Sequence, residues 1–365
     1  MKRAFASVAV FAATALFAAS AGAHDRSHGH HGDDRSNRPV TYAVVGDTPY
    51  GQPQLENFAN DAAEIDADPR VRLVMHLGDI KTGSSECSSS YFEQIRAGFD
   101  QFDDPFVYTP GDNEWTDCHR ANNGGYWPAG PVLNGDLRPA RLDEIHRIFF
   151  DRPGWTLGQD PRRVETQGGH YVENVLWSQS RVEFGTLNVP GSNNDWAPWF
   201  GQPLTSSQID EVNSRTKASL VWLDRIFDRA RDERAKAVAI GIQADMWIPA
   251  FAGNPALFDH FQPIVQALAH EALHFRGPVL LLNGDTHEFV DDYPLADPAH
   301  PEFKSMYGIT QDVPNLHRIT VNGSTTPCHE WLRLTADPRT RDVFSYEREQ
   351  FAKQPGFDPT VCPER

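Results

Sequence analysis

Five aspartates stand directly after short apolar runs of the sequence, and their side chains are the ones best placed to do chemistry. A single aspartate in a turn usually has a structural role, because its side chain hydrogen-bonds its own backbone. Five in succession indicate more, since converging carboxylates raise each other's pKa unless cations lie between them. The pattern predicts a site for two metal ions, formed by Asp47, Asp79, Asp112, Asp245 and Asp285.

The apolar runs before these aspartates are typical of strands, and amphipathic segments separate them. We expect strands within 40–47, 71–79, 105–112, 236–245, 278–287 and 316–324, and an antiparallel pair within 170–189. We expect helices near 53–67, 89–99, 140–150, 205–233 and 258–275. This alternation predicts an α/β sandwich in which a largely parallel sheet is joined by a second, mixed sheet. In such folds polar residues meet beyond the carboxyl ends of the strands.

The order of these strand-end motifs resembles that of the calcineurin-like metallophosphoesterases, over roughly residues 42–324. The family pattern has histidines at several places where this chain has a carboxylate, an amide or a proline. The resemblance implies a four-layer sandwich of two mixed β-sheets flanked by helices. The motifs read Asp47-Thr48-Pro49, Gly78-Asp79, Gly111-Asp112-Asn113-Glu114, Gln243-Ala244-Asp245 and Gly284-Asp285-Thr286-His287.

The resemblance also implies a role for each motif residue. Asp47 and His287 would bind the first metal, and Asp79 would bridge both metals. Pro49 stands where the family has a ligand and cannot replace it. Glu114 would orient other residues rather than bind metal. The second metal would be held by Asp112, Asp285 and Gln243, with Asp245 as an alternative to Gln243.

The implied activity is the hydrolysis of a phosphoester in a phosphorylated small molecule, by a hydroxide that bridges two divalent ions. Oxygen-rich ligand sets favour hard ions, so Mn²⁺ or Mg²⁺ is expected ahead of Ca²⁺, Fe or Zn²⁺. The alternative is a non-catalytic relative that binds a metal or a phosphoryl ligand. Its support is the set of lost histidines, above all at Pro49 and Asn113.

Asn113 occupies the place of the histidine with which the family stabilises the phosphoryl group or assists the leaving group. An amide can donate a hydrogen bond but cannot deliver a proton, and general acid catalysis contributes about 10²–10⁴-fold. His119 in the same loop is the candidate to replace that acid, although it is equally well explained as a loop histidine. The turn 191–194 can line the pocket, and Arg318 and His317 can meet a phosphate or serve as packing and surface residues.

A second motif, His270-Glu271-Ala272-Leu273-His274, matches the H-E-x-x-H pattern of zinc proteases. Helical periodicity places both histidines on the face opposite the apolar stripe, which is typical of surface residues. They also precede the strand whose far end carries His287, so the two motifs cannot share a site. The zinc protease is therefore the weaker alternative.

The N-terminus has the pattern of a signal peptide. Residues 1–23 combine Lys2 and Arg3, an apolar run and small residues before a cleavage site, which we expect after Ala23. The histidine-rich segment 24–38 is expected to be a disordered linker or a weak metal-gathering arm. The domain would cover 39–335, with a C-terminal extension over 336–365 tied to it. This organisation predicts an exported protein, periplasmic or extracellular, without a membrane span after cleavage.

Charge and cysteine content agree with that interpretation. The formal net charge is -17, and loss of Lys2 and Arg3 with the signal segment makes it -19. So acidic a protein repels phosphate backbones, which argues against nucleic acid as a partner. Four cysteines in an exported chain favour disulfides, with three possible pairings. Cys87–Cys118 and Cys328–Cys362 are favoured, and the sequence does not indicate the oligomeric state.

Overall fold

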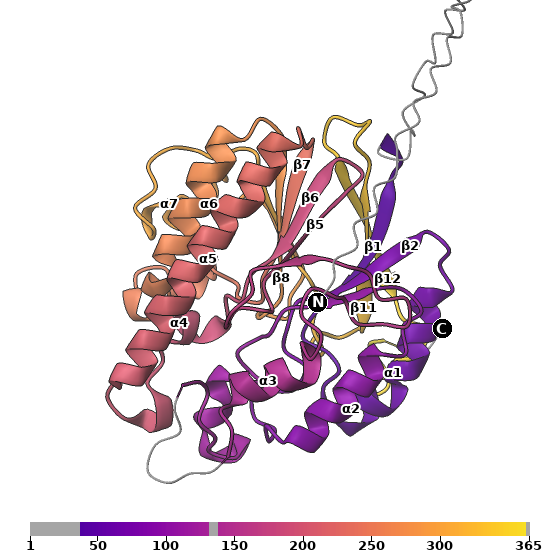
Figure 1. Ribbon diagram of the computed structural model, residues 1–365, viewed down its shortest axis with the longest axis vertical. Helices are drawn as coiled ribbons and strands as arrows, with labels where there is room; N and C mark the ends of the chain where they lie inside the picture. The colour runs from indigo at the N-terminus through magenta and orange to yellow at the C-terminus, as the bar shows by residue number, and fades with distance from the viewer. Residues whose placement is uncertain (1–36, 131–137, 363–365) are drawn as a thin grey trace, which may run out of the picture. The chain divides into compact units, whose positions relative to one another are not determined.

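A computed structural model describes residues 37–130 and 138–362, and these contain two mixed β-sheets (Figure 1). The first sheet has the strand order β12-β11-β1-β2-β3. Its strands β1 to β3 are mutually parallel, and β11 and β12 continue the sheet in antiparallel fashion. The bounds are β1 Val40–Val45, β2 Val71–His76, β3 Phe106–Tyr108, β11 Glu330–Ala336 and β12 Phe344–Gln350.

The second sheet has the order β4-β5-β6-β7-β8-β10-β9, with a parallel centre formed by β6, β7, β8 and β10. The edge strands β4, β5 and β9 pair in antiparallel fashion. The bounds are β4 Glu165–Thr166, β5 Val175–Gln179, β6 Val182–Thr186, β7 Ala237–Gly241, β8 Val279–Asn283, β9 Val290–Asp292 and β10 Leu316–Thr320.

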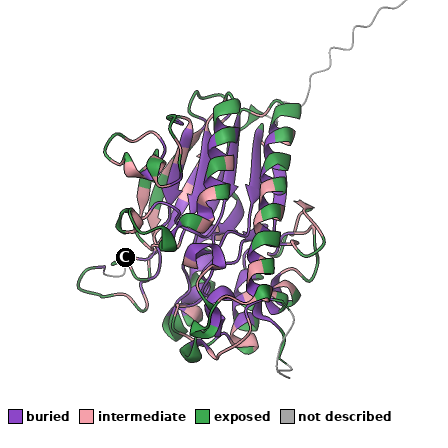
Figure 2. Cartoon of the chain, turned by 90° about the vertical axis from the view of Figure 1, so that its left-hand side faces the viewer, coloured by how far each residue is buried: buried purple, intermediate pink, exposed green. Residues whose placement is uncertain are grey.

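Helices cover the outer face of each sheet, with exposed residues outward and buried residues toward the strands (Figure 2). The α-helices are α1 Gly51–Asp66, α2 Ser89–Phe99, α3 Arg141–Phe149, α4 Gly191–Asp195, α5 Ser206–Asp232, α6 Gln262–His274 and α7 Glu302–Ser305. Short 3-10 helices lie at Thr116–His119, Ala121–Asn123, Trp199–Gly201, Pro249–Phe251, Pro255–Leu257 and Asp259–Phe261.

Three apolar cores separate four layers. Strand β1 shows why, because alternate side chains of a strand point to opposite faces. Val40, Tyr42 and Val44 pack between the two sheets, whereas Ala43 and Val45 pack against α1 and α2. A third core fills the space between the second sheet and helices α5 and α6. The expected fold class, a four-layer α/β sandwich of two mixed sheets flanked by helices, is confirmed.

Several expected segments differ from the structure in detail. Strands β4 and β9 were not predicted, because each has only two or three residues and little apolar periodicity. The C-terminal extension contains β12, which forms an edge of the first sheet beside β11. The expected signal peptide 1–23 and most of the expected linker 24–38 lie outside the described residues. Within the described residues, no helix is long and apolar enough to cross a membrane.

The four cysteines form two disulfides, Cys87–Cys118 and Cys328–Cys362. These are the pairs that the sequence favoured. The first joins the segment before α2 to the irregular loop after β3. The second ties the end of the described chain to the loop before β11. Each bridge therefore restrains a segment that has little regular structure of its own.

Candidate metal centre

The candidate ligands lie at the carboxyl ends of parallel strands in both sheets. Asp47 follows β1 and Asp79 follows β2, while Asp285 and His287 follow β8. All four have left-handed backbones, with φ of 52°, 57°, 80° and 66° in that order. Residues other than glycine rarely adopt this conformation, and functional sites often contain it. The sharp strand exits bring the side chains of the two sheets together.

Two groups of ligand atoms result, and Asp79 belongs to both. The first group is Asp47, Asp79 and His287, and the second is Asp79, Asp112 and Asp285. Within each group the ligand atoms lie within 4.8 Å of one another. The structure thus brings all six predicted metal ligands to one place. Five of them form the two groups that the sequence resemblance implied, and the sixth, Gln243, lies 3.2 Å from Asp112 Oδ1.

Burial makes these carboxylates costly to keep charged without a cation. Burial raises the pKa of Asp47, Asp79 and Asp285 well above the ordinary range. For Asp79 and Asp285, the charge of Asp112 raises the pKa further. A divalent cation removes both penalties at once, because it solvates the carboxylates and screens their repulsion. The donor set therefore fits a pair of metal ions.

Gln243, the sixth predicted ligand, presents its amide nitrogen to the carboxylates. Gln243 Oε1 accepts a hydrogen bond from the Gly191 backbone N–H at 2.5 Å. Its Nε2 lies 3.3 Å from Asp79 Oδ2 and 3.2 Å from Asp112 Oδ1. Gln243 bridges the second group as a hydrogen-bond donor, and it would have to turn its amide and release Gly191 to offer oxygen to a metal.

The contacts of His287 are compatible with the tautomer that a metal ligand needs. Its Nδ1 contacts the hydroxyl of Thr325, and its Nε2 lies 3.5 Å from Asp47 Oδ1. A proton on Nδ1 leaves the lone pair of Nε2 directed to the carboxylates. Burial lowers the pKa of His287, which favours the neutral, metal-binding form. Thr325 was not predicted, because it follows β10 in a loop with no motif.

Tyr50 is a further residue that the sequence interpretation missed. Its hydroxyl lies 3.3 Å from His287 Nε2 and accepts a hydrogen bond from Asn113 Nδ2 at 3.2 Å. Asn113 Nδ2 also donates to Asp79 Oδ2 at 2.8 Å. Tyr50 and Asn113 therefore place a phenol and an amide against both ligand groups. The one signal in the sequence was that Tyr50 follows Pro49 in the first motif.

Glu114 organises the surrounding loops. Its carboxylate accepts hydrogen bonds from the backbone N–H groups of Asp79, Ile80 and Gly111, at 3.2, 3.3 and 2.6 Å, and from the Tyr108 hydroxyl at 2.7 Å. These contacts join the loops after β2 and β3, and they occupy the carboxylate. Glu114 thus orients ligand-bearing loops and belongs to neither ligand group.

A buried lysine, also missed, lies in the same region. Lys81 Nζ donates to the backbone oxygens of Asn113 and Thr82, at 2.7 and 2.8 Å. Burial lowers the pKa of Lys81 to about 8, while the carboxylates of Glu114 and Asp79 oppose that shift. Its charge offsets part of the acidic field, and its two hydrogen bonds tie the backbone of Asn113 to that of Thr82.

The turn that contains Gly191 closes the far side of the second group. Ser192, Asn193 and Asn194 have φ between 51° and 57°, a left-handed turn that side chains must stabilise. Ser192 Oγ lies 2.9 Å from Asp112 Oδ2 and 3.0 Å from Asp117 Oδ1. The turn thus reaches the metal centre through Ser192, as the sequence suggested for this segment.

His119, the predicted replacement acid, contacts a different part of the chain. Its Nδ1 accepts a hydrogen bond from the Phe200 backbone N–H at 3.0 Å, and its ring packs edge-to-face on the Phe200 ring. Burial lowers the pKa of His119 to about 4, so the imidazole is neutral near pH 7. A neutral imidazole is a poor proton donor, and the hydrogen bonds of His119 do not reach either ligand group.

Asp245 and Arg318 form a buried ion pair beside the ligands. Arg318 donates to Asp245 Oδ1 at 2.5 Å and to both Asp292 oxygens at 2.6 and 2.8 Å. Asp245 Oδ2 accepts from the Thr286 hydroxyl at 3.0 Å. Both oxygens of Asp245 are therefore engaged. His317 lies 2.6 Å from Asp291 at the outer edge of the second sheet.

The H-E-x-x-H segment forms part of α6, with His270 and His274 exposed as expected. Glu271 is buried, and its carboxylate is 2.7 Å from Arg231 on α5. A glutamate paired with a guanidinium is a weak general base. Neither histidine belongs to a group of metal-binding side chains within the described ranges. The arrangement gives the zinc protease alternative no support.

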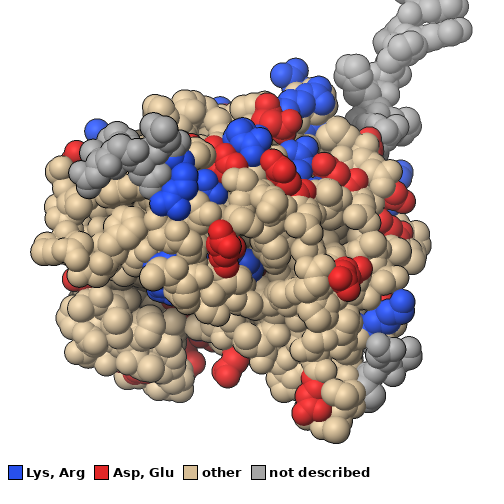
Figure 3. All heavy atoms as spheres, turned by 90° about the horizontal axis from the view of Figure 1, so that it is seen from below, with Lys and Arg blue, Asp and Glu red and all other residues tan. Residues whose placement is uncertain are grey.

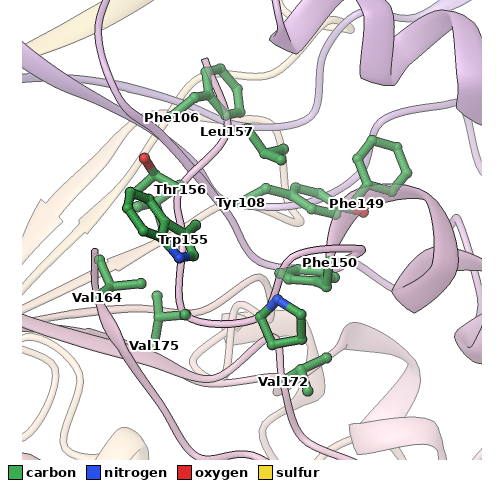
Figure 4. A pocket seen from close by; sticks show the side chains of 13 residues that line it. Phe106, Tyr108, Phe149, Phe150, Trp155, Thr156, Leu157, Val164, Val172 and Val175 are labelled. Carbon is green, nitrogen blue, oxygen red and sulfur yellow. The ribbon is translucent and has the colours of Figure 1, made fainter. Parts of the chain in front are cut away.

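Two other features bear on where ligands can bind. Figure 4 shows a cavity of about 20 Å³ lined almost wholly by apolar side chains such as Phe106, Phe149 and Leu157. A space of this size holds about one water and carries no chemistry of its own. On the face shown in Figure 3, acidic and basic side chains are interspersed and neutral surface predominates.

Comparisons with known proteins matched solved structures. No protein-family model and no curated protein matched the chain. Among solved structures, GAP50, the anchor in the inner membrane complex of Plasmodium, has a TM-score of 0.43 and 11% identity over 88% of this chain and 92% of its own. The purple acid phosphatase PPD1 from yellow lupin (Lupinus luteus) seeds has a TM-score of 0.45 and 10% identity, over 86% of this chain. This chain spans 52% of the lupin protein.

Proposed function

We propose that the chain is an exported, metal-dependent phosphoester hydrolase that acts on phosphorylated small molecules. The observation that carries the proposal is the position of Asp79, a buried carboxylate that belongs to both groups of candidate ligands. A carboxylate shared in this way suits two adjacent cations. The motif resemblance to calcineurin-like metallophosphoesterases is consistent with the same site and the same reaction.

Asp47, Asp79 and His287 would hold one ion, and Asp79, Asp112 and Asp285 the other. This set contains four carboxylates and one imidazole. Such an oxygen-rich set favours hard ions, so Mn²⁺ or Mg²⁺ is preferred. When bound, the ions supply Lewis acidity to the phosphoryl group and an activated water as the nucleophile. Gln243 contributes hydrogen bonds to Asp79 and Asp112 rather than a metal bond.

The side chains around the ions bind and orient the phosphoryl group. Tyr50 and Asn113 carry donors that now contact His287 and Asp79, and both can turn to a phosphoryl oxygen when those partners bind metal. Such donors stabilise the charge that develops in the transition state. With a proton on Nδ1 directed to Thr325, His287 would have its Nε2 free for the ion. Substrate recognition thus depends on neutral donors in place of histidine.

The leaving group receives little acid assistance in this arrangement. Asn113 has no proton to give, and His119 is neutral and contacts Phe200. Esters whose alcohol leaves readily, such as aryl phosphates, are therefore the preferred test substrates, because they need less help from a general acid. Alkyl esters should react more slowly by a factor of about 10²–10⁴.

The test is metal analysis of the purified protein together with hydrolysis of aryl phosphomonoesters and phosphodiesters in added Mn²⁺, Mg²⁺, Ca²⁺ or Zn²⁺. We expect about two ions per chain and activity that a chelator abolishes. Asp79→Asn should lose both ions and the activity, whereas Asp312→Asn, a substitution at an exposed carboxylate, should retain them. A chain that binds no divalent ion would refute the proposal.

The second candidate is a binding protein that holds metal or a phosphorylated ligand without turnover. The observation that favours it is the amide of Asn113 at the position of the family's acid. Bound metal with no hydrolysis of any aryl ester, and binding of inorganic phosphate that requires the metal, would identify this alternative. Metal-dependent hydrolysis that Asp79→Asn removes would exclude it.

A further inference from the structure

We propose that a pocket beside the metal centre binds the alcohol part of the phosphoester and selects an alcohol that carries an organic ammonium group. This inference names the substrate class for the proposed function and rests on it. The pocket has a volume of about 280 Å³, near the lower end of the range for small-molecule sites. It therefore suits a small head group rather than a large ring system.

The pocket shares a wall with the candidate ligands. Thr286 lines it and stands between Asp285 and His287 in the chain. Asp245 also lines it, and its backbone N–H donates to Asp285 Oδ2 at 2.9 Å. A phosphoryl group at the metal ions would thus lie beside this shared wall. Its alcohol would extend into the pocket.

The charge of the lining is negative. Asp245, Asp292 and Glu288 contribute three carboxylates, and Arg318 contributes the one guanidinium. Arg318 is only 3% exposed and pairs with both Asp245 and Asp292, so these three groups together carry one negative charge and leave no guanidinium available to an anion. Glu288 is exposed at the rim, and no described residue forms an ion pair with it. The pocket consequently favours a cation and disfavours a carboxylate or a second phosphate.

The remaining lining explains why the cation should be organic. Ile248, Pro249 and Val290 add apolar surface beside the carboxylates. A metal ion or a bare ammonium ion loses hydration against such surface and gains little from it. An alkylated ammonium group is weakly hydrated and buries its carbon atoms against the same side chains. Amino alcohols of the choline or ethanolamine type combine these properties in a small volume.

The test uses choline and its neutral isostere, 3,3-dimethylbutan-1-ol, which differ in charge and hardly in shape. Binding of each compound to the full mature protein is measured by calorimetry or NMR titration in the presence of a chelator. Under these conditions neither metal binding nor hydrolysis contributes to the signal. We expect choline to bind about tenfold more tightly than the isostere. Glu288→Gln should weaken choline about threefold and Glu288→Lys about tenfold, since each step adds one charge near the pocket.

The isostere should bind equally to the wild type, Glu288→Gln and Glu288→Lys. Equal binding would show that the pocket remains folded in both variants. Glu56→Lys, at an exposed position on α1, is the matched control and should leave choline binding unchanged. Equal binding of choline and the isostere, or choline binding that Glu288→Lys does not weaken, would overturn the proposal. With metal present, we compare kcat/KM for choline phosphate with kcat/KM for the phosphate of the isostere. The ratio of the two should fall from the wild type to Glu288→Gln and again to Glu288→Lys.

The two levels of the proposal fail separately. Charge-selective binding of choline to the metal-free protein, together with no hydrolysis of any phosphoester when metal is added, would support the pocket and refute the enzyme. Metal-dependent hydrolysis with no preference between choline phosphate and its isostere would support the enzyme and refute the selectivity.

Discussion

The backbone N–H of Asp285 lies 3.0 Å from Asp47 Oδ1 and 3.2 Å from Asp47 Oδ2. The two residues are 238 positions apart, and they follow strands of different sheets. This contact joins the sheets at their carboxyl ends and holds Asp47 against the second ligand group. The metal centre therefore depends on how closely the loops after β1 and β8 approach each other.

Gly284 is the residue that permits this approach. A Cβ atom at Gly284 would lie 2.4 Å from Asp47 Oδ2, a distance that side chains do not tolerate. Gly284→Ala should displace Asp47, abolish binding at the first metal group and destabilise the protein by roughly 1–3 kcal/mol. Metal content and thermal unfolding measure both effects. Gly169→Ala is the control: Gly169 has open space around it but a φ of 61°, so the substitution should cost some stability through backbone strain and yet retain full metal content.

Tyr50 should matter for the reaction and much less for the metal. Tyr50→Phe removes the hydroxyl that contacts Asn113 and His287 but keeps the ring. We expect unchanged metal content and a fall of about 10²-fold in kcat, the loss that follows removal of a transition-state donor. Steady-state kinetics with an aryl phosphate measure the effect on the reaction, and metal analysis of the same variant measures the effect on metal binding. Loss of metal in Tyr50→Phe would instead assign Tyr50 to the ligands.

The two disulfides close loops of similar length, with separations of 31 and 34 residues, and so form a matched pair. Removal of either, by Cys→Ser at both positions, should cost about 3–4 kcal/mol on chain-entropy grounds. Only Cys87–Cys118 restrains the loop that carries Asp112 and Asn113. Its removal should also weaken metal binding, whereas removal of Cys328–Cys362 should not. Denaturant unfolding and metal titration of both double variants check this difference.

The fold was largely predictable because its signals are local. Apolar runs that end at Gly-Asp turns mark β1, β2 and β8, and amphipathic periodicity marks α5 and α6. The same strand-end rule placed Asp47, Asp79, Asp112 and Asp285 at one edge. The strands β4 and β9 were missed, since so short an element is stabilised by its neighbours and not by its own residues.

The partners of the ligands were much less predictable. Tyr50 reaches Asn113 across 63 positions, and nothing in either local sequence indicates the contact. His119 shows the opposite case, because its place in the loop after β3 suggested an approach to the metals, while its ring packs on Phe200. Nearness in sequence to a ligand does not decide the direction of a side chain. Tertiary packing decides it.

His76 should make the metal-free protein less stable in mild acid. It is fully buried, its Nδ1 accepts a hydrogen bond from the Gly78 N–H at 3.2 Å, and its Nε2 lies 2.7 Å from Thr48 O. Both nitrogens are used by the neutral ring, and a second proton would point at the Gly78 N–H. Burial lowers the pKa of His76 to about 4.

The sign of the effect follows from proton binding. The unfolded chain protonates this histidine below about pH 6.5, and the folded chain does so only near pH 4. The unfolded state thus binds more protons between these values, and stability falls as the pH drops, by about 1.4 kcal/mol per unit and about 3 kcal/mol in all. His76→Gln keeps a donor and an acceptor without the titration, so its unfolding free energy in chelator should depend less on pH over this window. His270→Gln, at an exposed position, should show the same change of unfolding free energy with pH as the wild type. If His76→Gln also shows that same change, another group causes the acid sensitivity.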